Sequence, residues 1–232
     1  MILVLVFSGV AFAAPDVNLV PNCRLFLKFN EESWGAVVDD SSYGTDGVVH
    51  GSLTPASGKI GNCVTFAGDA DNYITVTEVS DSLSFGEDTD FAIAFWFKTA
   101  EVDETEFFLS KMVYQGDGYC ARLRGDDNKA SFTVHAYGGI SNSTITSVPV
   151  NDDTWHYAIG NFDRDANMVF YLDGEPNGTT PSMISLVNID NDEALYLGRR
   201  SYDTEPLALV GSIDCLMIFD KLLSADEITF LY

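Results

Sequence analysis

The sequence predicts a single antiparallel β-sandwich. Segments in which strand-forming residues alternate with period two dominate the chain from Cys23 to Tyr232. Turn residues interrupt these segments about every 8 to 12 positions, which is the spacing of sandwich strands. A chain of 232 residues suits one large all-β domain, and no linker or internal repeat divides it. We therefore expect one domain over residues 22–232.

The strand pattern is clearest in the middle of the chain. Residues 91–98 carry apolar side chains on both alternating faces, which predicts a central strand covered on both sides. Residues 131–137 place Phe132 and Val134 on one face. Residues 168–172 run into Asp173-Gly174, a strong signal for a tight hairpin turn.

The C-terminal part predicts two more strands and one helix. Residues 194–198 and 213–219 read as strands. Ser224 and Glu227 form a capping box, and Ile228 then begins an apolar stripe. The expected helix is short.

The first 13 residues are expected to be a signal peptide. This apolar run ends in Ala11-Phe12-Ala13, a small-x-small cleavage pattern, and is too short to span a bilayer. Basic residues do not precede it, so an upstream start or an atypical signal is open, and a buried strand is the alternative. The expected location is extracellular.

The charge balance excludes several partners. Twelve basic residues against 35 acidic ones give a net charge of -23, whereas nucleic acids, anionic membranes and heparin-type ligands require a basic surface. Membrane insertion is not expected. The short carboxylates suit turns and calcium sites, or simply a solvated acidic surface.

Four cysteines are available for disulfides if the protein is secreted: Cys23, Cys63, Cys120 and Cys215. Three connectivities are possible, and the sequence does not choose among them. Cys63 and Cys215 are opposite in phase to their apolar strand neighbours, so we expect both to point away from the sandwich core. Reduced thiols are the alternative.

Several segments together resemble the laminin-G-like, concanavalin A-like jelly-roll domains of the pentraxin/LamG superfamily. They are LFLKFN at 25–30, DSSYG at 40–44, FAIAFWFK at 91–98, DTWHY at 153–157, YLDG at 171–174, GSID at 211–214 and SADEI at 224–228. The resemblance covers nearly all of the chain after its first twenty residues. It implies a two-sheet jelly roll whose first and last strands are neighbours. The scaffold carries lectins, adhesion modules and some glycosidases, so it defines function poorly.

No catalytic residue is predicted. Glu101, Asp103 and Glu106 resemble the paired carboxylates of laminarinase-type glycosidases, but we expect them in a polar turn rather than on a groove strand. The three histidines show no spacing typical of a triad or a zinc site.

Calcium is the expected cofactor, because it binds carboxylate, amide and carbonyl oxygens. The resemblance implies two candidate sites. The first lies between the terminal strands, and its residues are Asn30, Asp40 and Asp214. The second lies on the sandwich rim, and its residues are Asp117, Asp190 and Asp192.

The leading hypothesis is a secreted, non-catalytic module that binds glycan or an extracellular protein through rim loops. Tyr114, Tyr137 and Tyr202 are candidate stacking residues. Trp96 could stack on a sugar, but we favour a covered position in the core for it. A glycoside hydrolase or polysaccharide lyase on the same fold is the second hypothesis, and a structural coat or matrix protein is the third.

Overall fold

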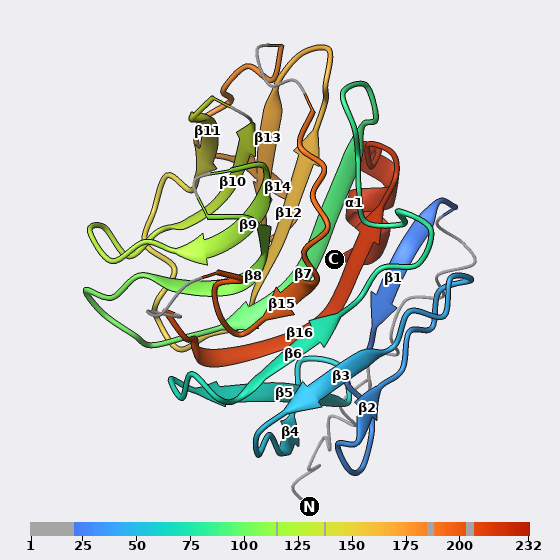
Figure 1. Ribbon diagram of the computed structural model, residues 1–232. Coiled ribbons are helices and arrows are strands. Elements are labelled where there is room, and N and C mark those ends of the chain that lie inside the picture. Colours follow the sequence, from blue (N-terminus) through green and yellow to red (C-terminus); the bar gives the residue numbers. More distant parts are fainter. Residues whose placement is uncertain (1–20, 115, 137, 185–187, 203–206) are drawn as a thin grey trace, which may run out of the picture.

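A computed structural model describes residues 21–232 except 115, 137, 185–187 and 203–206. The expected signal peptide lies outside the described residues. Two eight-stranded antiparallel sheets face each other (Figure 1). The predicted jelly-roll sandwich is confirmed, with one short helix among the described elements.

The sheets are called sheet A and sheet B. Sheet A has the order β14 (Glu175–Asn177), β13 (Met168–Leu172), β12 (His156–Phe162), β7 (Phe91–Lys98), β16 (Val210–Phe219), β5 (Asn62–Ala67) and β4 (Pro55–Ser57), with β1 (Cys23–Leu27) also paired to β16. Sheet B has the order β11 (Ile140–Ile145), β10 (Ala130–Ala136), β9 (Gly118–Leu123), β8 (Glu106–Met112), β15 (Leu195–Leu197), β6 (Tyr73–Val76), β3 (Gly47–His50) and β2 (Ala36–Val37).

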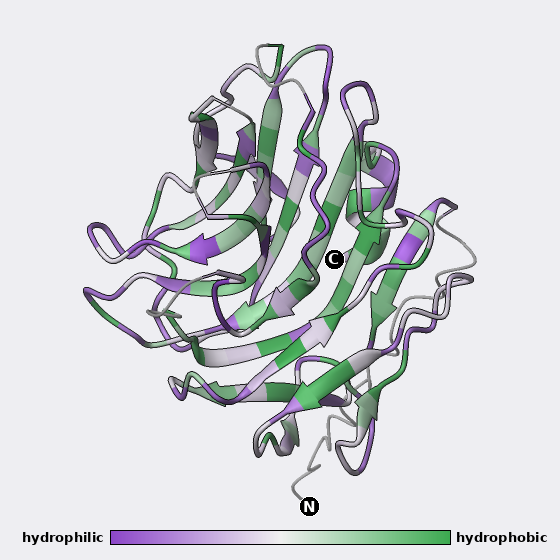
Figure 2. Cartoon of the chain, in the orientation of Figure 1, coloured by the Kyte–Doolittle hydropathy of each residue, from purple (hydrophilic) through white to green (hydrophobic). Residues whose placement is uncertain are grey.

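The main core lies between the two sheets, where the strand interiors are hydrophobic (Figure 2). Strand β7 shows why its sequence is apolar throughout. Its inward residues, including Phe95 and Phe97, join the main core, whereas Ala94 and Trp96 face a second core on the outer side of sheet A. The prediction of a central strand covered on both faces is therefore confirmed.

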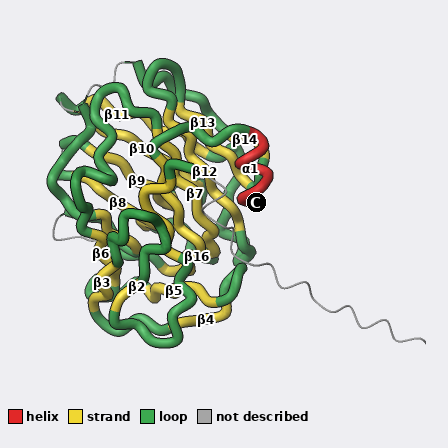
Figure 3. Tube along the Cα trace, turned by 90° about the vertical axis from the view of Figure 1, so that its right-hand side faces the viewer, coloured by secondary structure: helices red, strands yellow, loops and turns green. Residues whose placement is uncertain are grey.

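Helix α1 (Ala225–Leu231) covers this outer side of sheet A (Figure 3). Its predicted capping box is present: Ser224 Oγ accepts the Glu227 N–H, and the Glu227 carboxylate accepts the Ser224 N–H. Ile228 and Leu231 are buried against the sheet. The hairpin turn at Asp173-Gly174 is also confirmed, with positive φ at both residues as a primed turn requires.

The first and last strands are neighbours, as the resemblance implied. The C-terminal half of β16 pairs with β1, and its N-terminal half pairs with β5. The register between β16 and β7 shifts just after Asp214, and Cys215 has a φ of 49°. This bulge lies where β16 changes its partner.

The expected disulfides are absent, because all four cysteines are free and buried. Burial raises the pKa of Cys23 to about 12 and that of Cys120 to about 11, so both remain protonated at neutral pH. Cys63 and Cys215 lie outside the main core, as their phase predicted. The four thiols act as small apolar side chains.

Candidate binding site

The turn between β8 and β9 forms the exposed centre of the candidate site. The N–H of Val113 donates to the Asp117 carbonyl at 3.2 Å, which closes the turn. The turn presents Tyr114, whose side chain is among the most exposed aromatics of the described residues at 64%. Two of the predicted site residues, Tyr114 and Asp117, therefore lie on one short turn.

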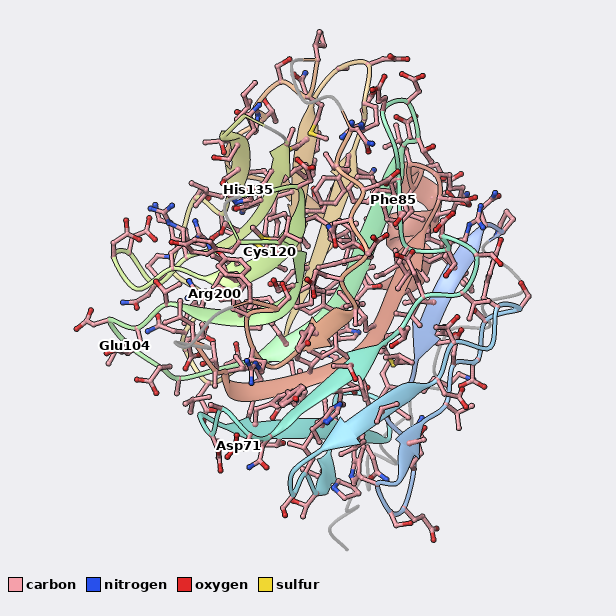
Figure 4. The ribbon with its side chains drawn as sticks, viewed as in Figure 1. Asp71, Phe85, Glu104, Cys120, His135 and Arg200 are labelled. Carbon is pink, nitrogen blue, oxygen red and sulfur yellow. The ribbon has the colours of Figure 1, made fainter. Side chains whose placement is uncertain are left out.

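A second loop brings Tyr202 to the same place. The Tyr114 and Tyr202 rings lie 5.6 Å apart in an edge-to-face arrangement. The Arg200 guanidinium lies 4.7 Å from the centre of the Tyr202 ring, and Figure 4 labels Arg200 near strands β8 and β9. Two of the three predicted stacking tyrosines thus meet, and Tyr137 lies outside the described residues.

Ser201 fixes the tyrosine-bearing loop to β8. Its hydroxyl donates to the Met112 carbonyl at 2.7 Å and accepts the Met112 N–H at 3.0 Å. It also lies 2.9 Å from the Ser110 hydroxyl. Because these groups are buried, the loop is held by hydrogen bonds that would be costly to break. The sandwich therefore fixes Ser201, the residue that precedes Tyr202.

An acidic pocket of about 340 Å³ lies next to the β8–β9 turn. The turn, the Tyr202 loop and this pocket are together called the rim. It is lined by Asp81, Ser84, Asp190, Asn191 and Asp192. Asp190 Oδ1 accepts the Gly86 N–H at 2.7 Å, and Asn191 Nδ2 donates to the Asp117 carbonyl at 3.1 Å. The pocket is thus joined to the β8–β9 turn.

Asp117 and Asp190 are close enough to repel each other. Burial and the charge of Asp190 raise the pKa of the Asp117 carboxyl. Asp117 Oδ1 is shielded from solvent and has no hydrogen-bond partner. Two of the predicted rim carboxylates, Asp190 and Asp192, therefore line the pocket, and Asp117 lies on the neighbouring turn with one unpartnered oxygen.

A buried ion pair supports this pocket from beneath. Lys111 is 1% exposed and lies 2.8 Å from Glu78 Oε1. Its ammonium donates to the Asn191 carbonyl at 2.7 Å. Glu78 accepts the Leu83 N–H at 2.8 Å and the Ser84 hydroxyl at 3.0 Å. The pair ties both pocket loops to β8 and β6.

Sequence reasoning missed this ion pair as well as Asp81 and Arg200. One signal was available: Lys111 is the sole charged residue between Phe107 and Val113. A charged side chain inside such a strand requires a buried partner. Its partner, Glu78, is 33 positions away in sequence, so only the fold could identify it.

The other predicted calcium residues are engaged with the protein itself. Asp214 is fully buried, and its Oδ2 accepts the Ile60 N–H at 2.9 Å. Asn30 Oδ1 accepts the Asn62 N–H at 2.8 Å. Asp40 pairs with the Lys28 ammonium at 3.3 Å. Asn30 and Asp214 hold the turn between β4 and β5, and burial raises the pKa of Asp214 to about 6.

Glu106 requires a correction. We expected it in a polar turn, but it begins β8 and is buried. Its Oε1 accepts the Val210 N–H at 2.9 Å, Oε2 has no partner, and burial raises its pKa to about 8. Glu101 and Asp103 do lie in the loop before β8, as expected. Within the described residues, no three His, Cys, Asp or Glu side chains form a ready metal cage.

The fold and the rim together define a jelly-roll module with an aromatic and acidic loop site. The sequence profile of the concanavalin A-like lectin/glucanases superfamily matches residues 68–229. The chain belongs to this superfamily.

Solved structures with the same fold include bacterial toxin domains. The binding domain of Paraclostridial Mosquitocidal Protein 1 superposes with a TM-score of 0.77 at 16% identity, covering 90% of this chain and 51% of that chain. A botulinum neurotoxin type C structure has a TM-score of 0.74 at 16% identity, covering 92% and 51%. The botulinum neurotoxin DC binding domain has a TM-score of 0.71 at 16% identity, covering 90% and 51%.

This chain therefore spans about half the length of these toxin domains. A search of the curated proteins finds no significant match. In the part of the chain that the structure describes, no helix has the length and apolar content needed to cross a bilayer.

Proposed function

We propose that the protein is a secreted, non-catalytic module that binds glycan or an extracellular protein through its rim. The observation that carries this proposal is the contact between Tyr114 and Tyr202 beside the acidic pocket. Exposed aromatic rings provide stacking surface for sugars, and carboxylates provide acceptors for hydroxyl groups. The buried anchors Lys111 and Ser201 hold these groups in place, which lowers the entropic cost of binding.

The similar toxin structures support a binding role. Cell entry of botulinum neurotoxin type C depends on interaction with two ganglioside molecules. The neurotoxin DC binding domain forms a complex with rat synaptotagmin II. Glycan and protein partners therefore both occur among proteins that share this fold. Because this chain spans half of those domains, the ligand is assigned here from its own rim residues.

A ligand experiment tests this function. A glycan array and an extracellular-protein pull-down should show binding that falls at least tenfold in Tyr202→Ala, roughly 1.4 kcal/mol. Tyr43→Ala is the control, because Tyr43 is also exposed but lies on the N-terminal loop. Hydrolysis of β-1,3- and β-1,4-glucans should be absent. Turnover that disappears in Glu101→Gln would instead support the glycoside hydrolase hypothesis.

We further propose that calcium binds at the rim between the pocket residues Asp190 and Asp192 and the neighbouring Asp117. The unpartnered Asp117 Oδ1 and its repulsion by Asp190 fit a site completed by a cation. Carboxylates would supply part of the ligand set, and Asn191, backbone carbonyls and waters the rest. Calcium there would neutralise the rim and give ligand hydroxyl groups a further electrophilic partner.

Calcium should raise the melting temperature of the protein. Binding to the native state alone stabilises by about 2.7 kcal/mol at a hundredfold excess over Kd. Asp117→Asn and Asp192→Asn should remove most of the calcium-induced shift, and Asp71→Asn, on an exposed turn (Figure 4), should keep it. Sodium chloride at matched ionic strength controls for screening. An equal shift in sodium would exclude the site, and a shift lost only in Asp214→Asn would place it between the terminal strands.

A further inference from the structure

A second pocket lies away from the rim, on the outer side of sheet A. Its volume is about 320 Å³, and it is lined by Lys59, Ile60, Trp96 and Tyr232. The Trp96 and Tyr232 rings are nearly parallel, with an interplanar angle of 25° and centroids 5.6 Å apart. Tyr157 packs against Trp96 from the second core at 4.8 Å. The pocket thus has an aromatic floor and one aromatic wall.

The opposite wall is a fixed turn. Lys59 and Ile60 lie in the turn between β4 and β5, where the Gly58 N–H donates to the Gly61 carbonyl at 2.9 Å. Asp214 accepts the Ile60 N–H, and Asn30 accepts the Asn62 N–H. Asp214 is fully buried at the bulge of β16. The buried Asp214 carboxylate therefore positions the turn that closes this pocket.

Lys59 gives the pocket a positive charge. Its ammonium lies 4.3 Å from the centre of the Trp96 ring. Among the described residues no carboxylate lies within ion-pair distance of it. Each of the other five lysines pairs with an acidic side chain: Lys28 with Asp40, Lys98 with Asp153, Lys111 with Glu78, Lys129 with Asp127 and Lys221 with Glu227.

An unpaired ammonium is unusual in a chain with 35 acidic residues. Because water already solvates an exposed lysine, the charge alone specifies no ligand. The position of the Lys59 ammonium over the Trp96 ring does indicate a ligand class. A bound ring could replace the ammonium on Trp96 while the ammonium contacted a negative group of the same ligand. The flexible Lys59 stem permits that movement.

We propose that this pocket binds a six-membered ring that has an apolar face and carries one carboxylate. The ring stacks on the face of Trp96 that the Lys59 ammonium now covers, beside Tyr232. Ile60 contacts its edge, and the carboxylate accepts hydrogen bonds from the displaced Lys59 ammonium. The two sources of this chemistry are an acidic sugar and a small aromatic acid. The site is separate from the rim and does not rest on the rim-binding function.

Titration of the whole chain with four small molecules tests the proposal. Glucuronate and benzoate present both the ring and the carboxylate, glucose presents the ring alone, and acetate presents the carboxylate alone. Binding is followed by tryptophan fluorescence and by chemical shifts of the Trp96 indole. At least one ring acid should saturate the site with an affinity tenfold or more above those of glucose and acetate, and the stronger acid identifies the source.

The variants locate the site. Lys59→Met keeps the apolar stem and should weaken the ring acid at least tenfold without improving glucose. Tyr232→Ala should weaken the binding of both ring acids, glucuronate and benzoate. Lys129→Met, which removes an equal charge from the segment between β9 and β10, and Tyr202→Ala on the rim should leave the affinity unchanged. Equal affinities for all four probes, no saturable binding, or an unchanged affinity in Lys59→Met would each overturn the proposal.

Discussion

Lys111→Met is expected to destabilise the protein by about 3 to 5 kcal/mol and to abolish ligand binding at the rim. Lys111 is 1% exposed, and its ammonium neutralises Glu78 at 2.8 Å. Removing it leaves the Glu78 carboxylate buried without a counter-charge and leaves the Asn191 carbonyl without its donor. The loops that carry Ser84 and Asn191 would then lose their common anchor.

Urea denaturation followed by circular dichroism measures this loss of stability. Lys129→Met is the matched control, because the Lys129 ammonium pairs with the half-buried Asp127 at 3.9 Å and a surface pair contributes about 0 to 1 kcal/mol. Adding Glu78→Gln to Lys111→Met should recover part of the stability by removing the isolated charge. A loss near 1 kcal/mol in Lys111→Met, or no recovery in the double variant, would contradict the assigned role of the pair.

Glu106→Gln is expected to flatten the pH dependence of stability between about pH 6 and pH 8. The folded carboxyl has a pKa of about 8, against an ordinary value of 4.5, because it is buried and lies near Glu101 and Glu104. The folded protein therefore keeps the Glu106 proton in this window while the unfolded chain has lost it. Stability falls as pH rises, by about 1.4 kcal/mol per pH unit at most.

The wild-type protein should thus lose roughly 2 kcal/mol from this group between pH 6 and pH 8, a shift in melting temperature of about 4 to 8 °C. Melting curves of Glu106→Gln should lack this component. Glu175→Gln is the control, since it removes the same charge from an exposed position on β14, in the sheet that does not contain Glu106. Its pH dependence should match the wild type, which retains the contributions of Asp214 and His156. Parallel curves for Glu106→Gln and wild type would refute the buried-acid assignment.

Local sequence patterns predicted the strands with most accuracy where both faces are buried. Residues 91–98 and 168–172 form β7 and β13 with the predicted bounds. The alternation of side chains along these strands indicates which of their two faces are buried. The capping box also placed the helix start correctly, because that motif satisfies the helix's own N–H groups without tertiary partners. The disulfides, by contrast, depended on inter-strand geometry that cysteine spacing does not contain.

The sequence singled out Asp117, Asp190 and Asp192 by residue type, and the structure places Asp190 and Asp192 in one pocket with Asp117 on the neighbouring turn. What the sequence did not indicate was the support beneath them. Glu78 follows β6 and Lys111 lies in β8, and these two segments meet only after sheet B has formed. An ion pair between distant segments has no periodic signature, so only its unmatched member, Lys111 in an apolar strand, was visible.

The sequence by itself determined the sandwich class, the doubly covered central strand, the C-terminal helix and the strongly acidic charge balance. These properties follow from local alternation, capping and net charge. Tertiary structure alone decided that Glu106 is a buried acid, that Asp214 receives backbone N–H groups, and that Trp96 forms the floor of a pocket. The reason is physical: the protonation and partners of a polar side chain depend on burial by distant segments, which a local pattern does not encode.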